Sequence, residues 1–101
     1  MARGHKLLTK ALAAKLPPLG STDGKGDAAV AQVKFFSPYS GWYWYATEFD
    51  GEDTFFGLVK GFETELGYFS LSELEAAKVF GSVPAVERDL YWDATPLSQV
   101  K

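Results

Sequence analysis

The sequence contains, at residues 42–62, the stretch WYWYATEFDGEDTFFGLVKGF, which predicts the centre of the fold. Trp42–Phe49 is rich in aromatic side chains, which are typical of β-strands. Asp50 and Gly51 follow, and an Asp-Gly pair between two such runs is a strong signal for a hairpin turn. Thr54–Phe62 predicts the returning strand. The stretch therefore predicts an antiparallel hairpin with an acidic turn.

The two faces of the first hairpin strand follow from strict alternation of its side chains. One face then carries Trp42, Trp44, Ala46 and Glu48, and the other carries Tyr43, Tyr45, Thr47 and Phe49. Because both faces bear large aromatic rings, we expect one face to lie in the core and the other to be partly exposed. In the returning strand, Gly57 and Gly61 predict a bulge, or the close approach of a large neighbour such as Trp42 or Trp44.

The segments around the hairpin predict helices and further strands. Before the hairpin we expect a helix over Thr9–Leu16, with Thr9 as its N-cap, and a strand over Ala29–Phe36. After the hairpin we expect a connection over 63–67, a helix over Ser72–Phe80 that ends at Gly81, and a strand over Ala85–Trp92. The second helix starts with a capping box, formed by Ser72 with Glu75 or alternatively by Ser70 with Glu73. The predicted fold class is α+β, in the order α-β-β-β-α-β. We expect one domain over residues 1–101, with a mostly antiparallel four-stranded sheet and two helices packed on it.

Composition excludes several classes of protein. The chain has no cysteine and a single histidine, His5, which excludes a disulfide scaffold, a cysteine-ligated zinc site, an iron–sulfur cluster and a multi-histidine metal site. We expect no metal, no cofactor and no catalytic residue, with a carboxylate-dependent enzyme as an alternative that composition does not exclude. No apolar run approaches the roughly 20 residues of a membrane span, so we expect a cytoplasmic protein without a membrane partner.

The net charge of −3 conceals an asymmetry along the chain. Residues 1–39 carry six basic and two acidic side chains, whereas residues 41–77 carry eight acidic side chains and one basic one, Lys60. An acidic surface of this kind repels nucleic acid and attracts a basic partner.

Aromatic side chains beside carboxylates at the hairpin predict a protein-binding surface. Trp and Tyr are enriched among the residues that dominate binding energy, and an acidic rim steers association with a basic partner. The candidate partner-binding residues are Trp42, Tyr43, Tyr45, Glu48, Asp50, Glu52 and Asp53. In this hypothesis the four carboxylates imitate phosphates, and Tyr43 or Tyr45 anchors the contact. Edge-strand pairing of two copies would instead give a homodimer.

Two other functions stay open on the sequence alone. The aromatic rings of residues 42–45 could stack on a single-stranded nucleic acid, but no Lys or Arg lies between Phe35 and Val59 to make a positive groove. Glu48 and Glu65 could be the carboxylate pair of a Mg²⁺-dependent enzyme, but no known acidic metal motif accompanies them.

Arg88 has a predicted structural role. It lies in the last predicted strand, on a face that it shares with apolar side chains such as Trp92. A cation on an apolar face needs a partner. We therefore expect an ion pair between Arg88 and Glu65 or Glu73.

Several motifs, spread from about residue 6 to residue 100, are long enough to be specific. They are Leu7-Leu8-Thr9, Leu16-Pro17-Pro18, Lys34-Phe35-Phe36, the segments 44–51, 55–59, 65–74 and 87–91, and Pro96-Leu97-Ser98. These motifs resemble those of domain-of-unknown-function family 2958, which consists of small single-domain bacterial proteins common on plasmids, integrative elements and phages.

The resemblance implies that the protein is encoded on a mobile genetic element, and it implies no particular activity. Small acidic proteins from mobile genetic elements are frequently inhibitors of host defence nucleases. By this analogy the resemblance implies a non-catalytic counter-defence protein, directed against CRISPR or restriction systems. Its expected partner is a defence nuclease or a surveillance complex with a basic face.

Overall fold

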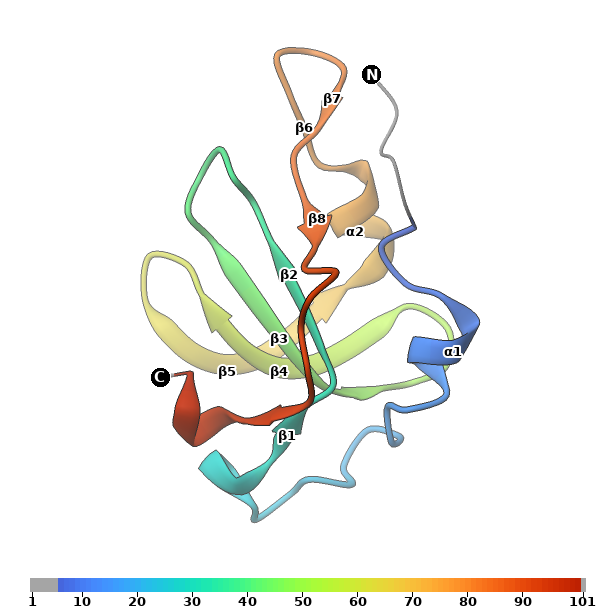
Figure 1. Cartoon of the computed structure of the whole chain (residues 1–101), viewed down its shortest axis with the longest axis vertical. Coiled ribbons are helices and arrows are strands. Elements are labelled where there is room, and N and C mark those ends of the chain that lie inside the picture. Colours follow the sequence, from blue (N-terminus) through green and yellow to red (C-terminus); the bar gives the residue numbers. More distant parts are fainter. Residues whose placement is uncertain (1–5, 101) are drawn as a thin grey trace.

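A five-stranded sheet forms the centre of the protein (Figure 1). The structure is a computed structural model that describes residues 6–100. The strand order is β5-β4-β3-β2-β8, and each neighbouring pair is antiparallel. The five strands are β2 (Val33–Phe36), β3 (Tyr43–Phe49), β4 (Thr54–Lys60), β5 (Thr64–Ser70) and β8 (Glu87–Arg88).

Short elements surround this sheet. Two small antiparallel ladders pair β1 (Val30–Ala31) with β9 (Thr95–Pro96), and β6 (Lys78–Val79) with β7 (Val83–Pro84). The helices are α1 (Lys10–Ala13), α2 (Leu71–Ala76) and the 3₁₀ turns η1 (Gly26–Ala28) and η2 (Leu97–Gln99). The predicted α+β class and mostly antiparallel sheet are therefore confirmed, whereas the predicted four strands and their order are wrong in detail.

The largest difference from the predicted element order is β5. Residues 63–67, predicted as a connection, belong mostly to this strand, which pairs with β4 along all seven of its residues. The segment lacks a clear apolar alternation because β5 is an edge strand, and none of its side chains is fully buried. The predicted last strand, Ala85–Trp92, is reduced to the two residues of β8.

Both helices are shorter than predicted. Thr9 is the N-cap of α1, as expected, and its hydroxyl accepts a hydrogen bond from the backbone N–H of Leu12 at 3.2 Å. Ser70 is the N-cap of α2, and its hydroxyl accepts a hydrogen bond from the Glu73 N–H at 3.3 Å, so the helix begins in the alternative frame. Helix α2 ends at Ala76 because the next segment forms the β6–β7 hairpin, where Phe80 and Gly81 both have positive φ. Gly81 thus serves a hairpin turn and not a helix end.

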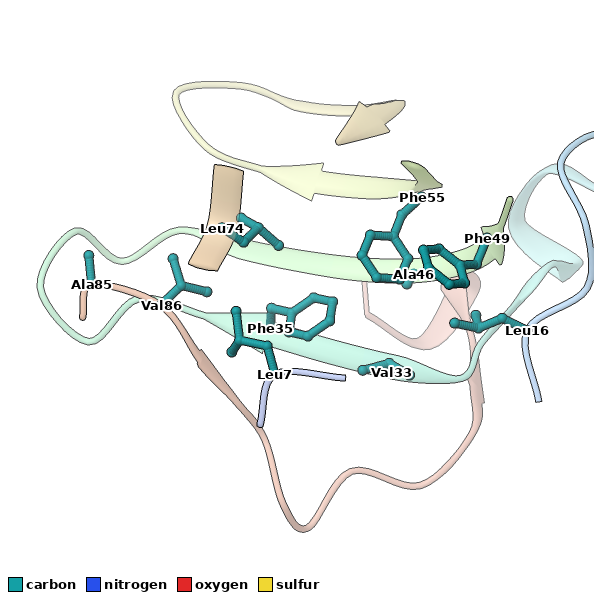
Figure 2. Close-up of a cluster of buried hydrophobic side chains, with 10 residues drawn as sticks. All are labelled: Leu7, Leu16, Val33, Phe35, Ala46, Phe49, Phe55, Leu74, Ala85 and Val86. Atoms are coloured by element: carbon teal, nitrogen blue, oxygen red, sulfur yellow. The ribbon is translucent and has the colours of Figure 1, made fainter. Parts of the chain in front are cut away.

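The sheet buries apolar side chains on both of its faces. On the first face, Phe35 and Phe55 pack with Leu74 of α2, and with Leu7 and Val86 from the segments beside the sheet (Figure 2). On the second face, a smaller cluster consists of Ala29, Ala31, Tyr45, Leu58 and Leu97, with Trp92 and Val100 packed against it. The N-terminal segment therefore covers one face of the sheet and the C-terminal segment covers the other.

A β-bulge at Thr47 interrupts the pairing of β3 with β4. Ala46 pairs with Gly57 and Glu48 pairs with Phe56, so Thr47 is an extra residue in β3. The Thr47 hydroxyl donates a hydrogen bond to the carbonyl of Phe56 at 3.0 Å, which holds the buried extra residue in place.

The bulge reverses the faces predicted for the end of β3. Phe49 joins Ala46 in the core of the first face, and Glu48 turns toward the side of Tyr45. Strict alternation predicted that Glu48 shares a face with Trp44 and that Phe49 shares a face with Tyr45. That prediction is wrong for the residues after Ala46. One inserted residue exchanges the two faces, because side chains alternate with a period of two.

Gly57 in β4 and Gly61 directly after β4 allow close approach, as predicted. A Cβ atom on Gly57 would lie 1.9 Å from the carbonyl oxygen of Tyr45, opposite the bulge. A Cβ atom on Gly61 would lie 2.5 Å from the indole of Trp42. Gly57 thus makes room for backbone and Gly61 makes room for an aromatic ring.

The ion pair predicted for Arg88 is wrong. Glu65 lies on the other edge strand, four strand spacings or about 19 Å away. Within residues 6–100, neither Glu65 nor Glu73 forms an ion pair with Arg88. The guanidinium instead donates hydrogen bonds to the backbone carbonyls of Lys6 and of Leu7, the latter at 3.3 Å. Arg88 therefore ties the N-terminal segment to the sheet.

We expect Arg88→Leu to lower the free energy of unfolding by about 1–2 kcal/mol, because it removes charged donors from backbone carbonyls. Urea unfolding followed by tryptophan fluorescence measures the change. Lys78→Leu, at an exposed position of β6, is the control and is expected to change stability by less than about 0.5 kcal/mol. Equal midpoints for Arg88→Leu and the wild type would contradict this role.

Candidate functional site

An apolar groove of about 480 Å³ opens on the first face of the sheet. Its walls come from the β2–β3 turn, the start of β3, the end of β5, helix α2 and the β6–β7 hairpin, elements that gather in the upper part of Figure 1. Its principal lining residues are Trp42, Trp44, Phe69, Leu74, Val79 and Glu73. A groove of this volume with a few polar groups is typical of a binding site.

Two tryptophans form one wall of the groove. The ring centroids of Trp42 and Trp44 lie 5.9 Å apart. Trp42 is held by its contact with Gly61 and by an edge-to-face contact with Phe62 at 5.2 Å. These rings are therefore positioned before any ligand arrives, which lowers the entropic cost of binding.

The rim of the groove is aromatic and acidic. Tyr39 is 49% exposed and makes an edge-to-face contact with Phe80, which is 82% exposed, at 5.7 Å. Glu73 is exposed at the first turn of α2. Among the lining residues in the described part of the chain it is the one charged side chain. The groove therefore favours an apolar group flanked by a positive charge.

The structure separates the predicted aromatic anchors. Trp42 lines the groove, whereas Tyr43 and Tyr45 lie on the second face of the sheet, where their rings stack at 6.3 Å. Tyr45 is only 5% exposed, so the prediction that it anchors a partner is wrong. Burial raises the pKa of the Tyr45 hydroxyl, and the neighbouring Tyr43 and Asp89 raise it further.

A lysine covers these tyrosine rings. The Nζ atom of Lys34 lies 5.0 Å from the centroid of Tyr43 and 5.6 Å from that of Trp92, and it forms an ion pair with Asp89 at 3.5 Å. Such cation–π contacts stabilise the second face internally. Tyr43, 37% exposed, is therefore already engaged within the protein.

The four predicted phosphate-mimicking carboxylates do not form one surface. Glu48 is only 2% exposed and faces the loop before η1, so its prediction as a surface residue is wrong. The Oδ1 atom of Asp50 accepts hydrogen bonds from the N–H groups of Glu52, Asp53 and Thr54. Asp50 therefore shapes its own turn, and Glu52 remains exposed beside it.

Asp53 connects the hairpin turn to the start of α2. Its carboxylate accepts hydrogen bonds from the hydroxyls of Ser70 and Ser72, and from the Ser72 N–H at 2.7 Å. The hydroxyl of Ser70 lowers the pKa of Asp53 most, followed by the N–H and then the hydroxyl of Ser72. For Asp50, the N–H groups of Glu52, Thr54 and Asp53 lower the pKa. Both carboxylates therefore have structural roles in addition to any surface role.

Glu48 organises the segment between α1 and β1. One carboxylate oxygen accepts a hydrogen bond from the Gly20 N–H at 2.8 Å, and the other accepts from the N–H and the hydroxyl of Thr22. Burial by itself raises the pKa of Glu48, but these hydrogen bonds together outweigh it and lower the pKa below the ordinary value of 4.5. Glu48 is therefore ionised at neutral pH and serves as an internal anchor.

Exposed negative charge lies along β5 and α2 as well as at the hairpin turn, where Asp50 and Glu52 are exposed. Residues 61–77 contain four glutamates and no lysine or arginine, and all four glutamates are exposed: Glu63, Glu65, Glu73 and Glu75. The sequence predicted an excess of acidic residues in this part of the chain. Where these side chains lie on the surface became clear only from the position of β5 in the sheet.

Several groove residues were not predicted as site residues. Tyr39 and Phe69 lie outside the helices and strands predicted above, and Val79 lies in the predicted helix over Ser72–Phe80. No sequence signal links them, because their contacts arise from the β6–β7 hairpin folding over the sheet. The Trp42-x-Trp44 pair was the one local signal for this site.

Residues 6–100 contain no group of three or more His, Asp or Glu side chains placed to hold a metal ion. In the same part of the chain, no helix has the length and apolar character needed to cross a bilayer.

Comparison with known proteins identifies a family. The sequence profile of a family described as protein of unknown function (DUF2958) matches residues 7–100. No curated protein and no solved structure matches the chain.

Proposed function

Because this chain belongs to the DUF2958 family, whose description assigns no activity, we propose from its own residues that it is a non-catalytic protein-interaction module. The proposed binding site is the groove lined by Trp42 and Trp44. The observation that carries the proposal is this preformed aromatic groove of about 480 Å³ with a carboxylate at its rim. Fixed tryptophans in a concave surface are the usual anchors of protein recognition.

The charge of the surface supports a basic partner. Glu73 stands at the rim, and Glu63 and Glu65 extend the negative charge along β5. We infer that the partner inserts an apolar side chain between the tryptophans and α2, and places a lysine or arginine near Glu73. A protein that handles nucleic acid offers such a basic face. A defence nuclease or surveillance complex is one such protein, and occupying its basic face would make this chain a counter-defence inhibitor.

We expect substitution of the groove rim to weaken partner binding at least tenfold, because it removes one exposed aromatic ring and reverses one charge. The variant is Tyr39→Ala with Glu73→Lys, two exposed positions that leave the core intact. Tagged protein is used to capture partners from a bacterial lysate that contains CRISPR and restriction systems. Captured proteins are identified by mass spectrometry, purified, and titrated against each variant.

The matched control is Tyr91→Ala with Asp93→Lys, which makes the same chemical changes at exposed positions outside the groove. The proposal requires one identified partner that keeps its affinity for the control and loses it for the groove variant. Equal affinity for both variants contradicts it. Salt-sensitive binding of a single-stranded oligonucleotide, or a Mg²⁺-dependent activity lost in Glu65→Gln, would favour nucleic-acid binding or catalysis instead.

A further inference from the structure

The outer side of β5 is an open sheet edge. β5 pairs with β4 over Thr64–Ser70, and within residues 6–100 no strand pairs with its other side. In an antiparallel ladder, about half of the backbone N–H and C=O groups of an edge strand point away from its neighbour. Seven residues of edge are long enough to template another strand.

The two faces of β5 present different side chains at this edge. On the first face, Glu65 pairs across to Val59, and Gly67 pairs across to Gly57. A Cβ atom on Gly67 would meet nothing within 4 Å, so the sheet surface is open there. A neighbouring strand would therefore find a negative charge at Glu65 and free space at Gly67 on this face, before it reaches the ring of Phe69 in the groove wall.

The middle of the second face of β5 is apolar, between Thr64 and Ser70 at its ends. Leu66 is 43% exposed and Tyr68 is 68% exposed, and Tyr68 makes an edge-to-face contact with Phe56 at 5.0 Å. A neighbouring strand would bury apolar side chains against Leu66 and Tyr68. Successive side chains of a strand bound at this edge would therefore meet negative charge on one face of the sheet and apolar surface on the other.

We propose that β5 binds an extended segment of the partner protein, in which basic and apolar side chains alternate, as a sixth strand of the sheet. This inference rests on the proposed function and specifies how the partner is recognised. Main-chain hydrogen bonds supply affinity in such strand addition, and alternate side chains supply specificity. Basic side chains of the segment lie toward Glu65, and apolar ones pack on Leu66 and Tyr68.

Two observations favour this occupant. A second copy of the chain would bring Glu63 and Glu65 of both copies to one acidic edge, whereas a basic segment neutralises them. The edge is also continuous with the groove, because Phe69 and Ser70 of β5 line the groove wall next to Glu73. A partner strand on β5 would run directly past the tryptophan groove.

The test uses a synthetic peptide in which lysine alternates with valine, long enough to pair with all seven residues of β5. It is titrated into the isotope-labelled full-length protein and followed by NMR. We expect the amide signals of Thr64–Ser70 to shift, and those of β8, Glu87–Arg88, to stay in place. Glu63→Lys with Glu65→Lys should weaken binding about tenfold, because two favourable charge contacts become repulsive.

Three controls separate strand addition from general charge attraction. Asp23→Lys with Asp93→Lys makes the same change in net charge at exposed sites away from β5, and should retain the affinity. A peptide with the same side chains but alternate N-methylated amides cannot pair with the edge and should not bind. A glutamate–valine peptide should not bind either.

Other outcomes overturn the inference in distinct ways. Shifts confined to the groove residues would leave the proposed function standing and refute strand addition. Equal binding of the N-methylated peptide would show charge attraction without pairing. A concentration-dependent dimer, measured by sedimentation and lost in the Glu63→Lys, Glu65→Lys variant, would identify the second copy as the occupant.

Discussion

Gly57→Ala is expected to lower the free energy of unfolding by about 3 kcal/mol, which corresponds to roughly 15 °C in melting temperature for a domain of this size. The added Cβ atom would lie 1.9 Å from the carbonyl oxygen of Tyr45 and 2.9 Å from its carbonyl carbon. Both atoms belong to the backbone of the central strand, so no side-chain rotation relieves the clash. The β3–β4 pairing must open around the bulge instead.

The measurement is urea unfolding followed by circular dichroism and tryptophan fluorescence. Gly67→Ala is a matched control, since Gly67 is the direct cross-strand partner of Gly57 and a Cβ atom there meets nothing within 4 Å. We expect Gly67→Ala to change stability by less than about 0.5 kcal/mol. Similar losses for both variants would show that the cost is a general property of glycine in this sheet.

Glu48→Ala is expected to lower the free energy of unfolding by about 3 kcal/mol at neutral pH, because it leaves the N–H groups of Gly20 and Thr22 without their acceptor. Glu52→Ala is the control. Glu52 is an exposed carboxylate in the turn that follows the same strand, and its removal should cost less than about 0.5 kcal/mol. Equal effects of the two substitutions would contradict the anchoring role of Glu48.

The contribution of Glu48 should also depend on pH. The folded protein holds the pKa of Glu48 below the ordinary value of 4.5, so the unfolded chain binds more protons near that pH. The stabilisation is therefore complete above about pH 4.5 and is lost as the pH falls through the folded-state pKa. The stability difference between the wild type and Glu48→Gln should be largest at pH 7 and should shrink in acid. Asp50 and Asp53, whose pKa values are also lowered, keep part of the acid dependence in the variant.

The hairpin was predictable because its signals are local. Aromatic runs on either side of Asp50-Gly51 specify two strands and a turn, and Gly61 indicates the ring of Trp42 that packs on it. The bulge at Thr47 was not predictable at its position. The one feature of the sequence that indicates the bulge is Gly57. It predicts that another part of the chain comes close, but it does not identify Thr47 as the extra residue of the opposite strand.

The edges of the fold were less predictable than its centre. β5 has no buried face to impose an apolar alternation, and it is ordered by pairing with β4. The segment after Ala76 has helical composition, but Val79 packs against the core of the first face through a hairpin. Tertiary contacts override local propensity in both segments.

The candidate site was predictable only in part. Trp42 was identified because tryptophan is rare and commonly dominates interfaces. Tyr45 and Glu48 were misplaced, since their exposure depends on the C-terminal segment and on the loop that contains Gly20 and Thr22. Both faces of this sheet are covered by segments that are distant in sequence. The local sequence pattern therefore does not predict which side chains of a strand become buried.

The covering of the second face by residues near position 97 has a consequence for folding during synthesis. Strands β3, β4 and β5 are joined by short turns and can pair as soon as they leave the ribosome. The apolar surface around Tyr45 and Leu58 then stays open until Leu97 and Val100 arrive, and β9 closes on β1 across more than sixty residues of chain. Closing such long loops is slow. We expect the nascent protein to pass through a stage in which the sheet has formed and its second face is still exposed, which is the stage at which a chaperone would be needed most.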